Sequence, residues 1–300
     1  MKRVLTAVVL IPAVLLLVFK AAPALVLLAV AGVSYFCVRE FVEIAKGHGL
    51  RPLKVLLFCL VLIPYLVPLM LWLKSGSEAS LSPFPFIELV ICSPLAILIA
   101  AMFRPNLSEA LPDAAVSLLG FLYIGMGLFS VWFMLAGRGY SRLLVFCLLV
   151  VVWSGDISAY FVGTYLGRRK LAPRISPNKT WEGTIASLIT ATALGSAILL
   201  NANPIFDWLL RHHLVYFWEQ WPVGSAAHFS CPTWFALTAC ATINIAAQLG
   251  DLAESAMKRG ANLKDSGAIL PGHGGMLDRV DALLFAAPVA MLLFVIFRVG

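Results

Sequence analysis

The sequence has few charged residues: Asp, Glu, Lys and Arg together make up 12% of its 300 residues, whereas hydrophobic residues make up 61%. A soluble globular domain is about half apolar and about a quarter charged. The composition therefore excludes an ordinary soluble enzyme and predicts a protein with many membrane-spanning helices.

Cysteine motifs and nucleic-acid-binding patterns are also missing. The six cysteines are scattered, mostly within apolar runs, and no CxxC motif or metal-ligand spacing occurs among them. This distribution is typical of small core residues rather than of a disulfide framework. The net charge of +7 comes with no basic face that has interleaved aromatic side chains. It therefore fits contact with anionic lipid head groups better than nucleic-acid binding.

Long apolar runs set the expected fold. Each is near the ~20 residues that a spanning helix needs, so the sequence predicts an all-α, polytopic membrane protein with about nine transmembrane helices. The first run has no A-x-A-like cleavage site before the second, so we interpret it as a retained helix. The runs lie at about 4–19, 21–38, 55–73, 86–103, 114–136, 143–162, 182–200, 233–250 and 282–298.

The distribution of basic residues predicts the orientation. If the N-terminus is cytoplasmic, the cytoplasmic segments hold 16 of the 22 Lys and Arg residues, as the positive-inside rule favours. This orientation places two charged loops, 163–181 and 251–281, on the cytoplasmic side of the cell membrane and the 201–232 loop outside. The chain then divides into an apolar scaffold of about five spans, 1–142, and a reactive region, 143–300.

Residues 255–281 contain the densest group of ionisable side chains, together with five glycines. Cations that hold phosphates, carboxylates that hold a metal, and glycines that let the backbone approach a ligand are what phosphoryl transfer at a membrane surface requires. The ionisable residues are Lys258, Arg259, Lys264, Asp265, His273, Asp278, Arg279 and Asp281.

Two acidic pairs frame this segment. Asp251 and Glu254 should emerge at the cytoplasmic end of the 233–252 helix, where they share one face with Lys258. Asp278 and Asp281 should open the last helix, whose dipole favours carboxylates in its first turn. Convergence of the two pairs would make a site for a hard cation such as Mg²⁺. The alternative is a set of solvated helix ends with ordinary i, i+4 ion pairs.

Two further residues have more than one interpretation. Asp156 lies within or at the end of the 143–162 span, where an unpaired carboxylate is costly. We interpret it as a carboxylate near the substrate or metal; the alternative is a structural partner for a nearby Lys or for helix-terminal N–H groups. His273 could be a ligand, a base or a turn residue.

The second charged loop reads GRRKLAPRISPNKTWEG over 167–183. Thr180 should cap a helix that begins near Trp181. This helix N-terminus would suit a phosphate, and we assign Ser176 and Lys179, in a proline-bounded turn, to substrate contact. No GxxxxGK[ST] motif is present, so the loop is not a P-loop.

Three stretches resemble one known family. The segment Ser255–Asp281 reads S-A-M-K-R-x4-K-D-S-G-x2-L-P-x-H-G-G-M-x-D-R-V-D and resembles the full signature of the phosphatidate cytidylyltransferases (CDP-diacylglycerol synthases). The D-x-x-A-Y-x-x-G-x-x-x-G-R at 156–168 and the I-S-P-N-K-T-W-E-G at 175–183 are similar to that family as well. Together the stretches cover about 50 residues.

The resemblance implies an enzyme that joins phosphatidic acid to CTP, giving CDP-diacylglycerol and pyrophosphate, with Mg²⁺ alone or with a second cation. It also implies an all-helical homodimer with a cytoplasmic site open to lipid. Metal ligation would fall to Asp251 and Asp278, with Asp281 and Glu254 close by.

Phosphate contacts are expected from the cations and glycines. Lys258, Arg259 and Lys264 would hold the triphosphate or the lipid phosphate, and the N–H groups of Gly274 and Gly275 would approach the phosphates closely. Lys258 also belongs to the expected catalytic group, with Asp251, Asp278 and Asp281. The remaining expected substrate contacts are Asp265, His273, Arg279 and Asp156.

Two alternatives stay open. A membrane phosphotransferase of the CDP-alcohol type also uses clustered aspartates, but its D-G-x2-A-R-x8-G-x3-D-x3-D pattern is absent. A cation-coupled transporter or channel could use Asp156 and the paired acids as an ion path. Such a protein would more naturally spread its charges through several spans, whereas here they gather at one end.

Overall fold

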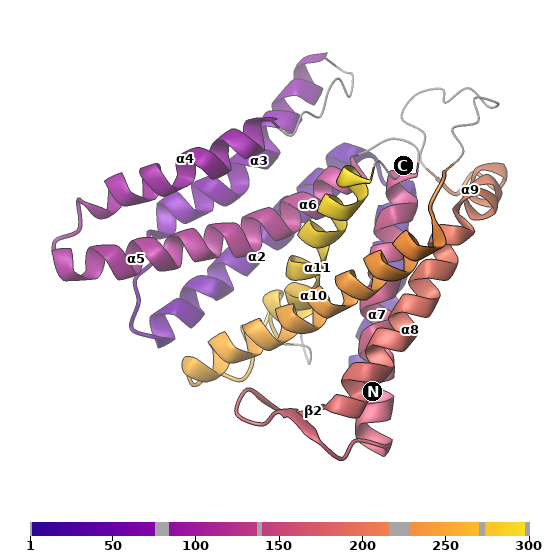
Figure 1. The fold of residues 1–300 in the computed structure, drawn as a ribbon. Coiled ribbons are helices and arrows are strands. Elements are labelled where there is room, and N and C mark those ends of the chain that lie inside the picture. Colours follow the sequence, from indigo (N-terminus) through magenta and orange to yellow (C-terminus); the bar gives the residue numbers. More distant parts are fainter. Residues whose placement is uncertain (1, 76–83, 137–139, 216–228, 270–273, 298–300) are drawn as a thin grey trace.

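The computed structural model describes residues 2–75, 84–136, 140–215, 229–269 and 274–297. These residues form eleven α-helices, one π-helical segment and one two-stranded sheet (Figure 1). The elements are α1 (Lys2–Lys20), α2 (Pro23–Gly47), α3 (Lys54–Ser75), α4 (Phe84–Ala101), α5 (Leu107–Gly120), η1 (Phe121–Met126), α6 (Gly127–Leu135), α7 (Ser141–Tyr165), β1 (Lys170–Ala172), β2 (Ser176–Thr180), α8 (Trp181–Leu200), α9 (Ala202–Arg211), α10 (Thr233–Gly260) and α11 (Leu277–Ile296).

The helices confirm a polytopic membrane protein. Within the described residues, seven segments are long and apolar enough to cross a membrane: α2, α3, the continuous run from α5 through η1 to α6, α7, α8, α10 and α11. The two other predicted spans also form helices, α1 and α4, but their qualifying apolar stretches, Leu10–Lys20 and Phe86–Ala101, are shorter. The number of nine crossings stays a prediction.

The helices that carry the two charged segments pack together. α7 packs along α8, and α10 packs against both α8 and α11. α11 in turn packs against α6, so that α10 and α11 lie between the α7–α8 pair and the N-terminal helices (Figure 1). Gly127 on α6 permits this packing, because a Cβ atom there would come within 2.7 Å of the Leu284 side chain on α11.

A polar cluster fixes α10 against α8. Asn244 Nδ2 donates to Ser187 Oγ at 3.1 Å, and Gln248 Nε2 donates to Asn244 Oδ1 at 2.7 Å. Ser187 and Asn244 are almost fully buried. Polar side chains of membrane helices commonly hydrogen-bond across helix interfaces in this way. The cluster therefore sets the position of the helix that carries Asp251 and Glu254.

The structure corrects the prediction in two places. Ser176–Thr180 is a strand, β2, rather than a turn, and it pairs antiparallel with β1 in the register Lys170↔Thr180 and Ala172↔Ser176. A two-stranded sheet consists only of edge strands, so Pro177 is tolerated there although it lacks an N–H group. The 201–232 loop contains a short helix, α9, which buries Phe206 and Leu209.

Candidate active site

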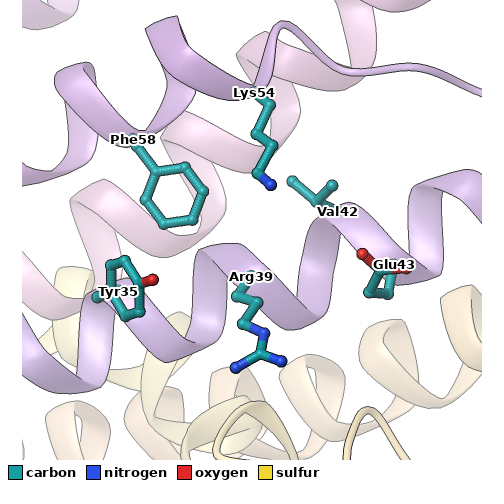
Figure 2. Close-up of a pocket in the computed structure, with 6 residues that line it drawn as sticks. All are labelled: Tyr35, Arg39, Val42, Glu43, Lys54 and Phe58. Carbon is teal, nitrogen blue, oxygen red and sulfur yellow. The ribbon is translucent and has the colours of Figure 1, made fainter.

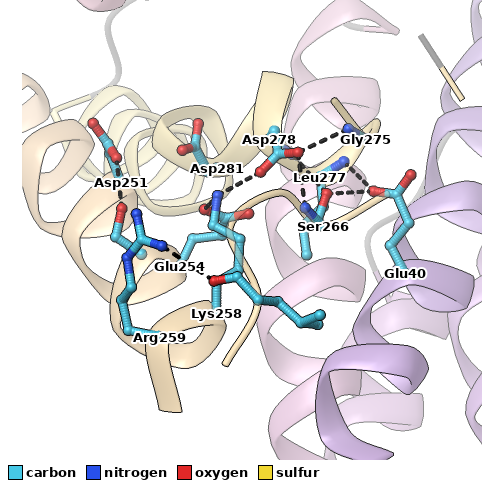
Figure 3. A network of polar contacts seen from close by, with 12 residues as sticks. Glu40, Asp251, Glu254, Lys258, Arg259, Ser266, Gly275, Leu277, Asp278 and Asp281 are labelled. Atoms are coloured by element: carbon cyan, nitrogen blue, oxygen red, sulfur yellow. Dashed lines mark hydrogen bonds and ion pairs between the residues drawn. The ribbon is translucent and has the colours of Figure 1, made fainter. Parts of the chain in front are cut away.

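The two predicted acidic pairs meet at the start of α11. Helix α10 continues past the predicted membrane crossing to Gly260, so that Lys258 lies on it as expected, and α11 begins at Leu277 with Asp278 in its first turn, also as expected. Lys258 Nζ forms ion pairs with Glu254 Oε2 on its own helix and with Asp278 Oδ1 on α11 (Figure 3). All three side chains are buried or nearly so. Lys258 therefore joins the acids of the two helices.

Asp278 is also held by backbone N–H groups. Its Oδ2 atom accepts hydrogen bonds from Ser266 N at 2.9 Å and from Gly275 N at 2.7 Å. Gly274 has a φ of +78°, a backbone conformation that favours glycine, and a Cβ atom there would fall against Oδ2 of Asp278. The N–H of Gly275, which we expected near a phosphate, thus serves Asp278 in this structure. His273, the other expected contact in this turn, lies outside the described residues.

A second ion pair joins the other charged loop to α10. Lys179 Nζ on β2 lies 2.5 Å from Asp251 Oδ2. Asp251 also accepts a long hydrogen bond, 3.4 Å, from Ser255 Oγ. Asp156 on α7 is close enough to interact electrostatically with both Asp251 and Lys179. The two loops that we expected on one side of the membrane are therefore in contact.

The cap of α8 is confirmed. Thr180 Oγ1 accepts a hydrogen bond from Gly183 N at 3.2 Å at the helix N-terminus. Glu182 accepts hydrogen bonds from the backbone N–H groups of Arg168 and Arg169, which fix the start of the hairpin. Ser176 is half-buried at the beginning of β2, opposite Ala172.

Carboxylates outnumber the paired cations in this cluster. Asp281 Oδ1 accepts a hydrogen bond from Ala282 N at 2.8 Å, and its carboxylate interacts electrostatically with those of Asp251 and Asp156. The same carboxylate also interacts with Lys258. Five acids (Asp156, Asp251, Glu254, Asp278 and Asp281) thus gather around two lysines (Lys179 and Lys258).

This excess of carboxylates fits a hard divalent cation. Apart from its ion pair with Lys258, the fully buried Glu254 carboxylate has no hydrogen-bond partner in the described part of the chain. No group of three or more His, Cys, Asp or Glu side chains is arranged to hold a metal ion among the described residues. Mg²⁺ does not require such a group, because it usually binds one or two carboxylates together with substrate phosphates and water.

Other expected contacts lie at the edge of the cluster. Lys264 and Asp265 are exposed and form no ion pair or hydrogen bond with the residues that the structure describes. Arg259 is exposed and donates to the carbonyl oxygen of Leu263 at 3.3 Å. Arg279 is exposed in the first turn of α11. Their expected roles toward substrate stay predictions.

Glu40, which is not among the residues expected from the sequence, also belongs to the network. It lies on α2 with 4% of its surface exposed, and its carboxylate accepts hydrogen bonds from the loop that precedes Asp278 (Figure 3). A signal was present in the sequence. Glu40 is three residues after Cys37 and four before Ile44, so it falls on the apolar, core-facing side of the helix.

A separate cavity of about 470 Å³ lies between α2 and α3. It is lined by Tyr35, Arg39, Val42, Glu43, Lys54 and Phe58 (Figure 2). Lys54 reaches into it from the first turn of α3, and the rings of Tyr35 and Phe58 lie 5.1 Å apart along its wall. None of the expected site residues lines this cavity.

Comparison with protein families gives a match over almost the whole chain. The model of the cytidylyltransferase family matches residues 1–297. That range includes all three stretches on which the resemblance in the sequence was based.

Curated relatives point to the same family. The chain is 40% identical over 158 residues to a phosphatidate cytidylyltransferase of Bacillus subtilis, which is 53% of this chain and 49% of the relative. It is 40% identical over 178 residues to one of Brucella abortus, covering 59% of this chain and 56% of the relative. It is 35% identical over 183 residues to one of Staphylococcus haemolyticus, covering 61% and 60%. The chain thus spans roughly half of the length of these relatives.

Proposed function

The chain belongs to the cytidylyltransferase family, and from this premise we propose that it is a phosphatidate cytidylyltransferase. It would transfer CMP from CTP to phosphatidic acid and release pyrophosphate. The observation that carries the proposal is the position of Lys258 between Glu254 on α10 and Asp278 on α11, within the signature segment of a chain that the family model matches. The names of the relatives support phosphatidic acid as the acceptor.

The proposed reaction needs little proton transfer. A phosphate oxygen of phosphatidic acid is already a nucleophile at neutral pH; it attacks the α-phosphorus of CTP, and the bond from that phosphorus to the bridging oxygen of the β-phosphate breaks. The obstacle is the repulsion between two polyanions. Catalysis of phosphoryl transfer is accordingly mostly a matter of positioning and charge stabilisation.

Each part of the cluster has a task in this scheme. Lys258 and Lys179 would contact substrate phosphates after exchanging their present carboxylate partners, and Asp251 with Asp278 would hold Mg²⁺, alone or with a second cation. Asp281 and Glu254 would supply further negative charge next to that metal site. When bound, the metal neutralises charge on the triphosphate and the pyrophosphate. The contact between the Lys179 hairpin and α10 supports a single site built from both loops.

The site needs access to both a lipid and a soluble nucleotide. We propose that it faces the cytoplasm from the cell membrane, with the N-terminus inside, because this orientation follows from the distribution of Lys and Arg in the sequence. We also propose a homodimer, which the family resemblance implies.

The test is a measurement of pyrophosphate release by the purified protein in detergent. We expect release that requires CTP, phosphatidic acid and Mg²⁺ together, and almost none from an Asp278→Asn variant of normal thermal stability. Release of CMP from CDP-diacylglycerol on addition of an alcohol would instead indicate a CDP-alcohol phosphotransferase. Cation uptake into proteoliposomes without pyrophosphate release would indicate a transporter.

A further inference from the structure

Glu40 holds the two ends of the loop that lies before Asp278. Its Oε2 atom accepts hydrogen bonds from Ser266 Oγ and from Leu277 N, both at 2.8 Å, and its Oε1 atom accepts one from Met276 N at 2.9 Å. These donors lie more than 220 residues later in the chain. A single buried side chain of α2 thus fixes both residue 266 and residues 276–277.

The contacts replace a missing cap of α11. A helix leaves its first N–H groups without intrahelical partners, and in α11 the N-cap residue, Met276, makes no side-chain capping hydrogen bond. Glu40 accepts from the N–H groups of Met276 and Leu277, and a negative charge at a helix N-terminus is favourable. The first turn of α11, which carries Asp278, is therefore anchored by a residue of another helix.

Ser266 links Glu40 to Asp278 directly. Its hydroxyl donates to Glu40 Oε2 at 2.8 Å and accepts from Asp278 N at 3.3 Å, while its backbone N–H donates to Asp278 Oδ2 at 2.9 Å. Movement of Ser266 would therefore disturb one hydrogen bond to the Asp278 carboxylate and one to the Asp278 backbone N–H.

Two glycines make room for Glu40. A Cβ atom at Gly267 would come within 2.6 Å of Glu40 Oε1, and one at Gly275 would overlap both the Glu40 carboxylate and the Ser266 hydroxyl. Neither glycine needs a positive φ. Their small size permits close packing around the carboxylate, so the contacts of Glu40 require glycine at both positions.

We propose that Glu40 is a positioning residue for Asp278: it holds Ser266 and residues 276–277 in the arrangement that the reaction requires. The inference rests on the proposed function for its kinetic part, whereas the loop contacts can be tested without any turnover. Glu40 acts through Ser266 and the N–H groups of Met276 and Leu277.

The first experiment measures amide hydrogen exchange of Met276 and Leu277 in the full-length protein in detergent. In Glu40→Gln, the amide nitrogen that replaces one oxygen cannot accept a hydrogen bond, so we expect exchange to become ~10-fold faster or more at Met276 or Leu277, whichever N–H group then faces that nitrogen. The matched control is Glu43→Gln, three residues further along α2, where an exposed carboxylate pairs with Lys46; its exchange should stay as in the wild type. Unchanged exchange in Glu40→Gln would overturn the proposal.

The second experiment separates positioning from stability. A positioning role predicts that kcat of Glu40→Gln falls on the order of 10²-fold per folded molecule, with the KM for CTP and phosphatidic acid nearly unchanged. Glu40→Asp keeps both acceptor oxygens and should recover part of this loss. A purely structural role predicts a lower Tm and a smaller folded fraction with normal kcat, and that result would contradict the proposal.

A double-mutant cycle tests the link through Ser266. If Glu40 acts through Ser266, the loss of kcat in Glu40→Gln combined with Ser266→Ala should be close to that of Glu40→Gln alone. Losses that multiply would contradict this link. If Glu40→Gln does not fold, Glu40→Asp and Ser266→Ala give the same comparison. A wild-type protein without pyrophosphate release would refute the proposed function, while the exchange measurement would still decide whether Glu40 holds the loop.

Discussion

Lys179 on β2 and Asp251 on α10 form an ion pair of 2.5 Å that connects the hairpin after α7 to the cytoplasmic end predicted for α10. The two side chains are about one-quarter and one-third exposed. At such a partly exposed position the pair itself adds little stability, typically 0–1 kcal/mol at a surface. We infer that its residues are placed there for substrates rather than for the fold.

This gives the first prediction. If Lys179 binds a phosphate and Asp251 a metal, the double variant Lys179→Asp with Asp251→Lys should keep the ion pair and the Tm. It should nevertheless lose activity by more than ~10³-fold, because a carboxylate would then face the phosphate and an ammonium group would face the metal. Measurement of Tm and pyrophosphate release on the same sample distinguishes a role in substrate and metal binding from a role in stability. Recovery of activity in the exchanged pair relative to either single variant would show that only the pair matters.

The second prediction concerns the acids alone. Asp251→Asn and Asp278→Asn should each reduce kcat by on the order of 10³-fold or more, since a lost metal ligand removes several kcal/mol of charge stabilisation. Glu109→Gln, an exposed carboxylate on α5, is the matched control and should be near normal. Near-normal turnover in either aspartate variant, with Mg²⁺ at saturation, would remove that residue from the metal site.

Much of this site was predictable because its residues are close in sequence. The pairs Asp251–Glu254 and Asp278–Asp281 follow from helical spacing, and helix ends of adjacent antiparallel helices must meet. The core-facing position of Glu40 on α2 could have drawn attention to it, but its partners could not be predicted, because they are one hydroxyl and two backbone N–H groups more than 220 residues away.

The fold, like the site, was predictable where its residues form a regular pattern in the sequence. The apolar runs predicted α2, α3, α7, α8, α10 and α11 to within a few residues at most ends. The continuation of α10 past its apolar run is confirmed as well, because Asp251, Glu254 and Lys258 were expected on one helical face. The charged residues 254–259 stop the apolar run but not the helix, and Glu254 and Lys258 pair at i, i+4 within it. The hairpin was missed because its strands are short and polar, and hydrophobic periodicity carries no signal there.

The third prediction concerns topology. In a cysteine-free background, Lys264→Cys should react with a membrane-impermeant thiol reagent only after the cytoplasmic side is opened, and Arg211→Cys at the end of α9 should react in intact cells. Both positions are exposed in the structure, so accessibility depends on the side of the membrane alone. Reaction of both from one side would contradict the predicted orientation.

The fourth prediction concerns the polar cluster between α8 and α10. Asn244→Ala removes the hydrogen bonds to Ser187 and Gln248 and should lower the free energy of unfolding by about 0.6–2 kcal/mol, the range for such bonds in membranes. Thermal unfolding in detergent measures the loss. Thr242→Ala, an exposed hydroxyl that bonds only within α10 among the described residues, is the control; equal losses in both variants would show that the interhelical bonds add nothing.

The last prediction concerns Lys264, which is exposed and has no ion-pair partner in the described part of the chain. A solvated residue at this place predicts that Lys264→Ala changes kcat/KM by less than ~5-fold, because surface charges contribute only ~0–1 kcal/mol. We expect instead a loss on the order of 10²-fold, roughly 3 kcal/mol, because an exposed cation of the signature segment that has no partner among the described residues is available to a substrate phosphate. The KM values for CTP and phosphatidic acid, measured separately, show which phosphate it holds, since the one that rises identifies the substrate. Lys46→Ala, which removes an exposed lysine paired with Glu43, is the control, and similar kinetics in the two variants would show that Lys264 is a solvated surface residue.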